Sequence, residues 1–362
     1  MERYLAALEH EEIVVRRGRR SGLYSFVAVH STQRGPALGG CRLWPYDDAR
    51  LALRDVLRLS AAMTLKAAVA DLPLGGGKGV IRAEPGARLD SRRRRAALLD
   101  FADTVETLGG RYLTAEDVGV SSRDMTVISQ RTPHVTGLAR RRGGSGDPSP
   151  MTALGVHEGI VACVERVFGA PSMAQRSVAV VGLGHVGSRL ARRLARQGAR
   201  LVVADVDPGK RVLADELGAR WVSSAQALRA PVDVVAPCAL GAVLDHETVT
   251  DVRAPIVAGA ANNQLADDGL ADVLAAGGIL WAPDFVINAG GLIHIAAELA
   301  PGGYDARRAR AAVRGVGVTM RRLLDNAERT GSTPLAAALA LARERLEPRS
   351  GVRPLRWRPL PG

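Results

Sequence analysis

Residues 177–205 constrain the fold of this chain more than any other segment. The apolar run Ser177-Val-Ala-Val-Val181 leads into Gly182-Leu-Gly-His-Val-Gly187, which is followed by a helical pattern to Gln197 and by a second apolar run, Leu201-Val-Val-Ala-Asp205. A short strand, a glycine-rich turn, a helix and another strand form a βαβ unit. Further strand candidates at 232–236, 256–258 and 279–281 alternate with helices, so we predict an α/β fold with a doubly wound parallel sheet.

The glycine spacing in this unit favours a dinucleotide site of the Rossmann type. Gly182 permits the tight turn, Gly184 lets the backbone approach a pyrophosphate, Gly187 allows close helix packing, and the helix N-terminus attracts the phosphates. Asp205 ends the second strand 23 residues after Gly182 and would accept hydrogen bonds from the ribose hydroxyls of NAD. A 2′-phosphate would meet this carboxylate, so we expect NAD rather than NADP. A structural Rossmann domain without a cofactor is the alternative.

At 362 residues the chain is long enough for two domains. The Arg-, Gly- and Pro-rich stretch at 140–150 predicts a linker. We therefore expect an N-terminal α/β domain at 1–148 and a dinucleotide domain at 149–329, separated by a cleft. Helices at 330–348 are expected to pack back onto the first domain, and 349–362 to form a flexible basic tail.

Period-two alternation at 23–30 predicts a strand in the first domain, followed by breaks at Gly35-Pro36 and Gly39-Gly40. Helices are predicted from Asp47-Asp48 to about Lys66 and at 88–108. A short strand at 112–114 follows. Later helices are predicted at 152–168, 306–329 and 333–347.

Lysine is scarce in this chain. Of the 49 Lys and Arg residues, only Lys66, Lys78 and Lys210 are lysines. An ammonium can lose its proton near neutral pH when it is desolvated or lies beside another cation, whereas a guanidinium stays charged. Lys66 and Lys78 lie twelve residues apart, so we expect chemistry here that arginine cannot perform. Lys210 is expected on the rim of the dinucleotide domain.

Lys78 directly follows three glycines, Gly75 to Gly77, which predict room for a flat ring or a small substrate beside the amine. Asp117 follows the short strand at 112–114, and a carboxylate at a strand end is well placed to face a cleft. Lys66, Lys78 and Asp117 are therefore the candidate catalytic group. For each residue alone, an ordinary surface ion pair is the alternative.

The formal net charge of +12 raises the question of a nucleic-acid partner. The arginines are spread along the chain and only 4% of residues are aromatic, so surfaces on which bases could stack are scarce. We expect no nucleic-acid partner. The sequence also lacks a signal-peptide pattern and a stretch of about 18 apolar residues, which predicts a cytoplasmic protein without membrane contact. The isolated cysteines predict neither a disulfide nor a metal site.

A series of motifs resembles the leucine, valine and phenylalanine dehydrogenases of the Glu/Leu/Phe/Val dehydrogenase superfamily. They are Pro36-Ala-Leu-Gly-Gly40, Met63-Thr-Leu-Lys66, Leu74-Gly-Gly-Gly-Lys78, Thr114-Ala-Glu-Asp117-Val-Gly119, Pro237-Cys-Ala-Leu-Gly241, Ala258-Gly-Ala-Ala-Asn-Asn-Gln-Leu265 and Pro283-Asp-Phe-Val-Ile-Asn-Ala-Gly-Gly291. The resemblance runs in order from about Leu23 to Glu347. It implies that the domain at 1–148 serves substrate binding and oligomerisation. It also implies a homo-oligomer, from dimer to octamer, that acts on small molecules.

The resemblance also implies roles for individual residues. Lys66 would hold the substrate α-carboxylate, Lys78 would be the catalytic base, and Asp117 would contact the α-amino group and the reacting water. Gly39, Gly40, Met63 and Asn262 would line the same site. The residues implied for the cofactor are Thr152, Gly182, Leu183, Gly184, His185, Val186, Gly187, Asp205, Cys238, Ala239 and Asn262.

Substrate choice is implied by four apolar positions, Leu38, Ala115, Leu292 and Ile295, which offer a γ-carboxylate no partner. The bulk of Leu292 and Ile295 favours valine-sized groups. The expected reaction is reversible NAD-dependent oxidative deamination of a branched-chain L-amino acid (valine, leucine or isoleucine) to the 2-oxo acid and ammonia. The alternatives are a phenylalanine, tryptophan or specialised biosynthetic amino acid dehydrogenase, and a non-catalytic NAD-binding regulator.

Overall fold

The computed structural model describes residues 9–86, 89–239 and 243–347. Contacts between residues divide the chain into two compact units. Of the described residues, the first unit contains 9–86, 89–147, 295–305 and 342–347, and the second contains 148–239, 243–294 and 306–341. The predicted α/β architecture with two domains is confirmed, whereas the predicted tail at 349–362 lies outside the described residues.

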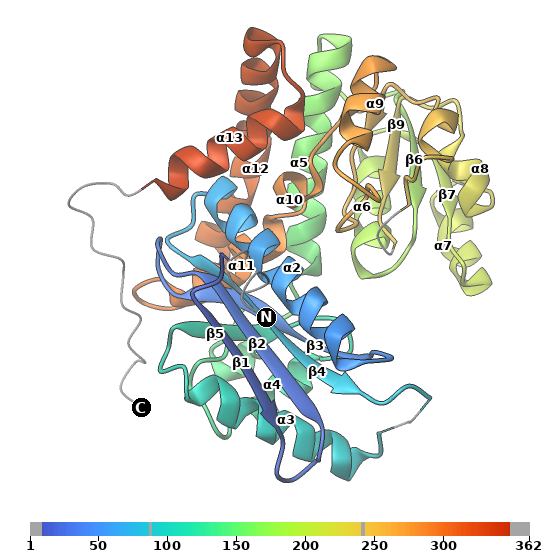
Figure 1. Cartoon of the computed structure of the whole chain (residues 1–362). Coiled ribbons are helices and arrows are strands. Elements are labelled where there is room, and N and C mark those ends of the chain that lie inside the picture. Colours follow the sequence, from blue (N-terminus) through green and yellow to red (C-terminus); the bar gives the residue numbers. More distant parts are fainter. Residues whose placement is uncertain (1–8, 87–88, 240–242, 348–362) are drawn as a thin grey trace. The chain divides into compact units, whose positions relative to one another are not determined.

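The first unit is built on a five-stranded mixed sheet with the strand order β1-β2-β4-β3-β5. Its strands are β1 (Glu12–Arg17), β2 (Tyr24–Ser31), β3 (Ala37–Pro45), β4 (Gly75–Ala83) and β5 (Tyr112–Glu116), and its helices are α2 (Ala49–Val69), α3 (Ser91–Glu106) and α4 (Ser122–Ile128). β3 runs parallel to β4 and β5, while β2 runs antiparallel to β1 and β4. Figure 1 shows α2 on one face of this sheet and α3 and α4 on the other.

The predicted strand at 23–30 is confirmed as β2, and its alternation explains how both faces are covered. Phe26 and Ala28 pack in a cluster with residues of α2, whereas Val27 and Val29 belong to the cluster that contains Phe101 of α3. Successive side chains of a strand point to opposite faces, so one short apolar run serves two cores.

The predicted break at Gly39-Gly40 is wrong, because both glycines lie inside β3. The run Gly75–Gly77 likewise opens the buried strand β4, which the sequence pattern did not predict. A Cβ atom on Gly39 would lie 1.7 Å from the carbonyl oxygen of Gly77. Glycine disfavours strands locally, but here its lack of a side chain lets two backbones approach closely.

Helix starts follow their capping residues. α2 begins where predicted, and the Asp48 side chain accepts a hydrogen bond from the Leu51 N–H at 2.9 Å. α3 begins at Ser91 rather than Arg88, because Asp90 caps it. The helix expected from Thr152 begins three residues earlier, at Ser149.

The second unit carries a six-stranded parallel sheet with the order β11-β10-β9-β6-β7-β8. Its strands are β6 (Ser177–Val181), β7 (Arg200–Ala204), β8 (Arg220–Trp221), β9 (Val234–Pro237), β10 (Ile256–Val257) and β11 (Leu280–Trp281). The order reverses between β6 and β9, as in the Rossmann fold. The predicted doubly wound sheet is confirmed.

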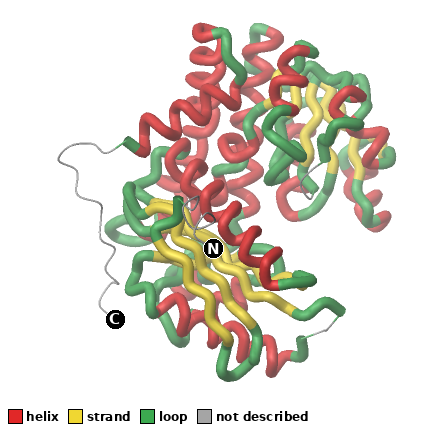
Figure 2. The backbone as a smooth tube through the Cα atoms, viewed as in Figure 1, coloured by secondary structure: helices red, strands yellow, loops and turns green. Residues whose placement is uncertain are grey.

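Further helices follow the first sheet in the chain and are drawn in red in Figure 2. They are α5 (Ser149–Phe168), α6 (His185–Arg196), α7 (Arg211–Glu216), α8 (Ser224–Leu228), α9 (Leu270–Ala276), α10 (Asp284–Ile287), α11 (Gly290–Ala296), α12 (Ala306–Thr330) and α13 (Pro334–Leu346). Short 3-10 helices span Arg140–Arg142, Pro208–Lys210, Val249–Asp251 and Ala297–Leu299. Within the described residues, no helix combines the length and the apolar character needed to cross a membrane.

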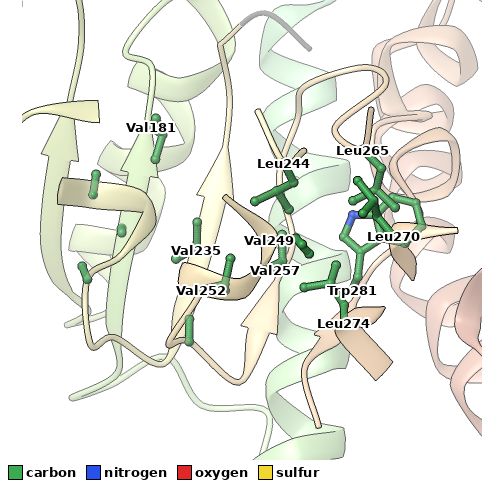
Figure 3. Packing of buried hydrophobic residues seen from close by; sticks show 14 of the residues in the cluster. Val181, Val235, Leu244, Val249, Val252, Val257, Leu265, Leu270, Leu274 and Trp281 are labelled. Carbon is green, nitrogen blue, oxygen red and sulfur yellow. The ribbon is translucent and has the colours of Figure 1, made fainter. Parts of the chain in front are cut away.

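The core of the second unit explains its continuous apolar strands. Figure 3 shows Val181, Val235 and Val257, which come from β6, β9 and β10, in one cluster with Leu270 and Trp281. Strands of a parallel sheet are buried on both faces, so their sequences read as apolar runs rather than as alternating patterns.

Candidate active site

Lys78 and Asp117 meet in the first unit. The Nζ atom of Lys78 donates to Oδ2 of Asp117 at 3.0 Å. The Lys78 side chain is 7% exposed and that of Asp117 is 20% exposed, so water screens this pair less than it screens a surface ion pair. Lys78 comes from the middle of β4, and Asp117 directly follows β5. The structure therefore brings together two members of the predicted catalytic group.

The alternation of β4 sets the direction in which Lys78 points. A Cβ atom on Gly76 would lie 2.1 Å from the Thr64 nitrogen of α2, and Val80 packs in the α2 cluster. Residues 76, 78 and 80 share one face of the strand. Lys78 therefore faces α2, the helix whose last turn carries Lys66.

The prediction that Gly75–Gly77 leave room for a ligand is wrong at these positions. Cβ atoms there would meet Ser31, Thr64 and Tyr112 at 1.8, 2.1 and 2.6 Å. The space is filled by protein, so the glycines serve close packing of β4 against its neighbours. Lys78 follows these glycines within the same buried strand, which fixes the direction of its backbone.

A second cation contacts Asp117. The Nε atom of Arg42, from β3, donates to Oδ2 of Asp117 at 3.0 Å. Burial raises the pKa of Asp117, but the positive charges of Lys78 and Arg42 outweigh burial and hold this pKa below its usual value. Sequence reasoning missed Arg42. The available signal was its place two residues after Gly40, on the same face of a strand.

Arg42 also binds a second carboxylate. Its Nη1 donates to Oδ2 of Asp55 at 2.8 Å, and Tyr46 Oη donates to the same oxygen at 2.5 Å. Arg58 donates to the other oxygen of Asp55 at 3.0 Å. Burial, which raises the pKa of Asp55, is outweighed by these donors and by the charges of the two arginines, so this pKa lies below its usual value. The arrangement fixes the guanidinium of Arg42 between two carboxylates.

The end of the helix that carries Lys66 is held by arginines distant in sequence. Arg345 of α13 donates to the carbonyl oxygens of Ala68 and Val69 at 3.1 and 2.5 Å. Arg34 donates to the carbonyl oxygen of Arg345 at 2.6 Å. Cations that satisfy the last carbonyl groups of a helix stabilise its C-terminus.

The other predicted substrate residues of the first unit lie on these same elements. Leu38 and Ala115 are buried in the adjacent strands β3 and β5, and Met63 is half-buried on α2. A Cβ atom on Gly40 would lie 2.7 Å from Cβ of Asp117. Gly40 therefore lets Asp117 approach β3, where Arg42 lies.

The glycine turn of the second unit fits a bound pyrophosphate. A Cβ atom on Gly187 would lie 1.9 Å from the carbonyl oxygen of Gly182, which itself has a φ of 102°. At Gly184 a Cβ atom would meet nothing within 4 Å in the structure. Gly184 and His185 are exposed, and no side chain in the described part of the chain caps the N-terminus of α6. The turn is thus tight where the protein packs and open where phosphate oxygens could accept from the helix N–H groups.

Asp205 lies directly after β7 and helps to hold the turn. Its Oδ2 accepts from the Leu183 N–H at 2.6 Å, and its Oδ1 accepts from the Asp207 N–H at 2.9 Å. A carboxylate has about four acceptor positions, so these bonds leave capacity for ribose hydroxyls. Val186 is half-buried in the first turn of α6.

The remaining predicted residues lie in loops and on the helices α5 and α11. Asn262 accepts at Oδ1 from Asn288 Nδ2 at 2.8 Å, so Asn288 is an orienting residue that sequence reasoning missed. Thr152 donates to the Pro148 carbonyl oxygen at 3.2 Å. Cys238 is half-buried and Ala239 is exposed after β9, while Leu240 and Gly241 lie outside the described residues. Leu292 and Ile295 are buried on α11.

Three descriptions of known protein families match parts of this chain. The family described as "Glu/Leu/Phe/Val dehydrogenase, dimerisation domain" matches residues 9–134, and "Glutamate/Leucine/Phenylalanine/Valine dehydrogenase" matches residues 209–326. A third description, "D-isomer specific 2-hydroxyacid dehydrogenase, NAD binding domain", matches residues 156–246. The last match covers the glycine turn.

Whole-chain relatives extend these matches. A leucine dehydrogenase of Bacillus subtilis is 41% identical over 95% of this chain and 93% of its own length. The chain belongs to the Glu/Leu/Phe/Val dehydrogenase family. Within the family, a valine dehydrogenase of Streptomyces virginiae is 41% identical over 93% of this chain and 94% of its own. An L-tryptophan dehydrogenase of Nostoc punctiforme is also 41% identical, over 93% of each chain.

Solved structures place the dehydrogenase in the same group. The crystal structure of L-tryptophan dehydrogenase from Nostoc punctiforme superposes with a TM-score of 0.81 at 37% identity, and covers 96% of this chain and 98% of its own. A hetero-hexameric glutamate dehydrogenase from Thermus thermophilus gives a TM-score of 0.78 at 27% identity, over 95% of this chain and 91% of its own. The predicted amino acid dehydrogenase is thereby confirmed.

Proposed function

We propose that this dehydrogenase catalyses reversible, NAD-dependent oxidative deamination of a branched-chain L-amino acid to the 2-oxo acid and ammonia. The buried contact between Lys78 and Asp117 carries the proposal, because it joins an amine that can exchange a proton to a carboxylate that can accept from an amino group. The similarity to leucine and valine dehydrogenases supports the choice of substrate class.

NAD, when bound, accepts the hydride from the substrate Cα. Gly184 and the N-terminus of α6 would bind its pyrophosphate, and Asp205 would bind its ribose. Thr152, Asn262, Cys238 and Ala239 are the further residues proposed to hold it. The same carboxylate at position 205 disfavours the 2′-phosphate of NADP.

Lys66 would bind the substrate carboxylate as a point charge, and Asp117 would accept from the α-amino group. Once the substrate is an iminium, water adds to Cα and gives one proton to the neutral amine of Lys78. The ammonium of Lys78 then returns this proton to the carbinolamine nitrogen, the Cα–N bond breaks to release ammonia, and the neutral Lys78 takes the hydroxyl proton as the 2-oxo acid forms. A guanidinium at position 78 would stay protonated and could not accept the water proton.

The proposed substrate pocket is apolar. Leu38, Ala115, Leu292 and Ile295 carry no charge, so a γ-carboxylate of glutamate would lose its hydration without gaining a partner. The bulk of Leu292 and Ile295 favours a valine-sized side chain, although one methylene discriminates by only about 1–3 kcal/mol.

An aromatic amino acid is the second candidate. The observation that favours it is the similarity to L-tryptophan dehydrogenase in both sequence and structure. We also propose that the enzyme acts as a homo-oligomer.

The test measures NADH formation with valine, leucine, isoleucine, phenylalanine, tryptophan and glutamate, each with NAD and with NADP. We expect the highest kcat/KM for valine or another branched-chain substrate with NAD, and negligible turnover of glutamate. A preference for tryptophan or phenylalanine would replace the branched-chain assignment. Activity with none of the six would contradict the proposed substrate class.

A further inference from the structure

Arg42 joins the Lys78–Asp117 contact to a second acidic group. Lys78 and Arg42 both contact Oδ2 of Asp117 at 3.0 Å, while Arg42 also contacts Asp55 at 2.8 Å. The Arg42 side chain is 21% exposed. One planar guanidinium therefore connects a carboxylate beside β5 to a carboxylate on α2.

The charges of this cluster balance without a proton on Lys78. Asp55 and Asp117 each carry a negative charge, since their pKa values lie below the usual range despite burial. Arg42 and Arg58 each carry a positive charge. Two aspartates and two arginines cancel, so a protonated Lys78 gives the cluster a net positive charge.

The uncharged neighbours do not alter this balance. Burial raises the pKa of Tyr46, Cys41 and Tyr112 above their usual values, so all three stay protonated and neutral. On β2, burial and the charge of His10 lower the pKa of His30, which therefore favours its neutral form.

The remaining charged neighbours are paired with one another or directed elsewhere. Arg94 and Asp124, which act on the neighbouring Cys41, form their own ion pair at 2.7 Å. Glu116 precedes Asp117 but interacts with Asp147 and Glu298. Lys66, in the last turn of α2, is the other cation that this helix places near its end.

We propose that Arg42 is a positioning residue for catalysis, which holds the Asp117 carboxylate and supplies a permanent balancing charge, so that Asp117 does not retain Lys78 as an ammonium. Without Arg42, Lys78 is the one cation in contact with Asp117 among the described residues, and their mutual attraction favours the protonated amine. With Arg42 in place, the same carboxylate orients Lys78 and still allows it to accept a proton. The inference rests on the proposed role of Lys78 as the base.

Arginine suits this position because of its shape. Its Nε and Nη1 atoms reach two carboxylates at once, in the plane of one guanidinium. The ammonium of lysine is a single point and cannot span both. Arg42→Lys therefore keeps a charge but loses the bridge, whereas Arg42→Gln loses the charge.

The first test is the dependence of kcat/KM for oxidative deamination on pH. In Arg42→Gln we expect the midpoint of the acidic limb to move upward by about one pH unit. At pH values below this midpoint, kcat/KM should be about tenfold lower than in the parent, and it should recover at higher pH. Arg42→Lys should raise the midpoint of the acidic limb by a smaller amount. Arg131→Gln, which removes an arginine from the exposed pair with Asp103, is the matched control and should leave the midpoint unchanged.

The second test reads the protonation of Lys78 without turnover. Acetic anhydride acetylates neutral amines, and with only three lysines in the chain the Lys78 peptide can be followed by mass spectrometry. The pH midpoint of Lys78 acetylation should rise in Arg42→Gln, while that of Lys210 stays constant.

The results distinguish failure of the proposed role of Arg42 from failure of the proposed role of Lys78. A uniform loss of kcat/KM at every pH with both midpoints unchanged would show that Arg42 is merely structural and would overturn the proposal. A shifted acetylation midpoint together with full activity of Lys78→Arg would keep the electrostatic role of Arg42 but reject Lys78 as the base. If Arg42→Gln does not fold, Arg42→Met removes the same charge, and an unshifted acetylation midpoint in that folded variant overturns the proposal.

Discussion

Lys78 of β4 contacts Asp117 at a distance of 3.0 Å between Nζ and Oδ2, although 38 intervening residues lie between them in the chain. The contact is possible because β3 lies between β4 and β5 in the sheet, and Gly40 of β3 has no side chain to separate them.

Lys78→Arg should abolish oxidative deamination. A guanidinium cannot act as a base near neutral pH, and a general base typically contributes at least about 100-fold. We expect kcat to fall by that factor or more, while NAD titrated against protein fluorescence binds as in the parent. Lys210→Arg is the matched control. Substantial turnover by Lys78→Arg would remove Lys78 from the mechanism.

Asp117→Asn should destabilise the fold in a pH-dependent way. Removing this carboxylate leaves Lys78 without its ion-pair partner and leaves Arg42 with Asp55 alone, which costs about 1–3 kcal/mol at pH 7. The pKa of Asp117 is depressed in the fold, so its contribution is present above the usual carboxyl pKa of about 4 and is lost as the pH falls through the folded value. Urea unfolding should therefore show a difference from the parent that shrinks below pH 4. Asp268→Asn, at an exposed site, should show no such trend.

The effect of Glu116→Gln on the free energy of unfolding should depend on pH in the opposite way to that of Asp117→Asn. Burial, with smaller effects from Asp147 and Glu298, raises the pKa of Glu116 from 4.5 to about 7. Between these values the folded state keeps a proton that the unfolded state loses, so stability falls as pH rises through this window. The neutral Gln side chain removes that loss. Allowing for solvent screening at this half-buried site, we expect Glu116→Gln to gain about 1–2 kcal/mol at pH 8 and nothing at pH 4.5.

In that experiment, chemical unfolding at the two pH values gives the comparison. An equal change in the free energy of unfolding at both pH values would mean that Glu116 titrates normally in the fold.

The two glycines of the nucleotide turn should respond differently to alanine. At Gly187 a Cβ atom would lie 1.9 Å from the Gly182 carbonyl oxygen, so Gly187→Ala should lower the melting temperature. At Gly184 the Cβ atom meets no atom within 4 Å, so Gly184→Ala should fold normally yet weaken NAD binding about tenfold or more, because the methyl group enters the space proposed for the pyrophosphate. Calorimetric titration with NAD and thermal melts separate the two effects. An unchanged affinity of Gly184→Ala for NAD would show that the pyrophosphate does not lie beside Gly184.

Several features could be predicted from the sequence because they are local. The βαβ unit around Gly182 and Asp205 needs only a strand, a turn and a helix in order, and each has its own residue pattern. The start of α2 at the Asp48 cap and the alternation of β2 follow from the same short-range rules. Lysine scarcity likewise made Lys78 a candidate without any structural information.

Other features were decided only by tertiary structure. Gly39 and Gly77 look like breaks in a sequence, yet they lie inside strands because their backbones pack against each other. Arg42 and Asp117 are 75 positions apart in the sequence, and no local pattern connects them. Charge balance depends on which groups share a buried site, and long-range pairing of strands sets those neighbours. The sequence therefore determined which residue types could perform the chemistry. The pairing of strands in the sheet decided which charges act on Lys78, because electrostatic interactions depend on distance in space and on exclusion of water.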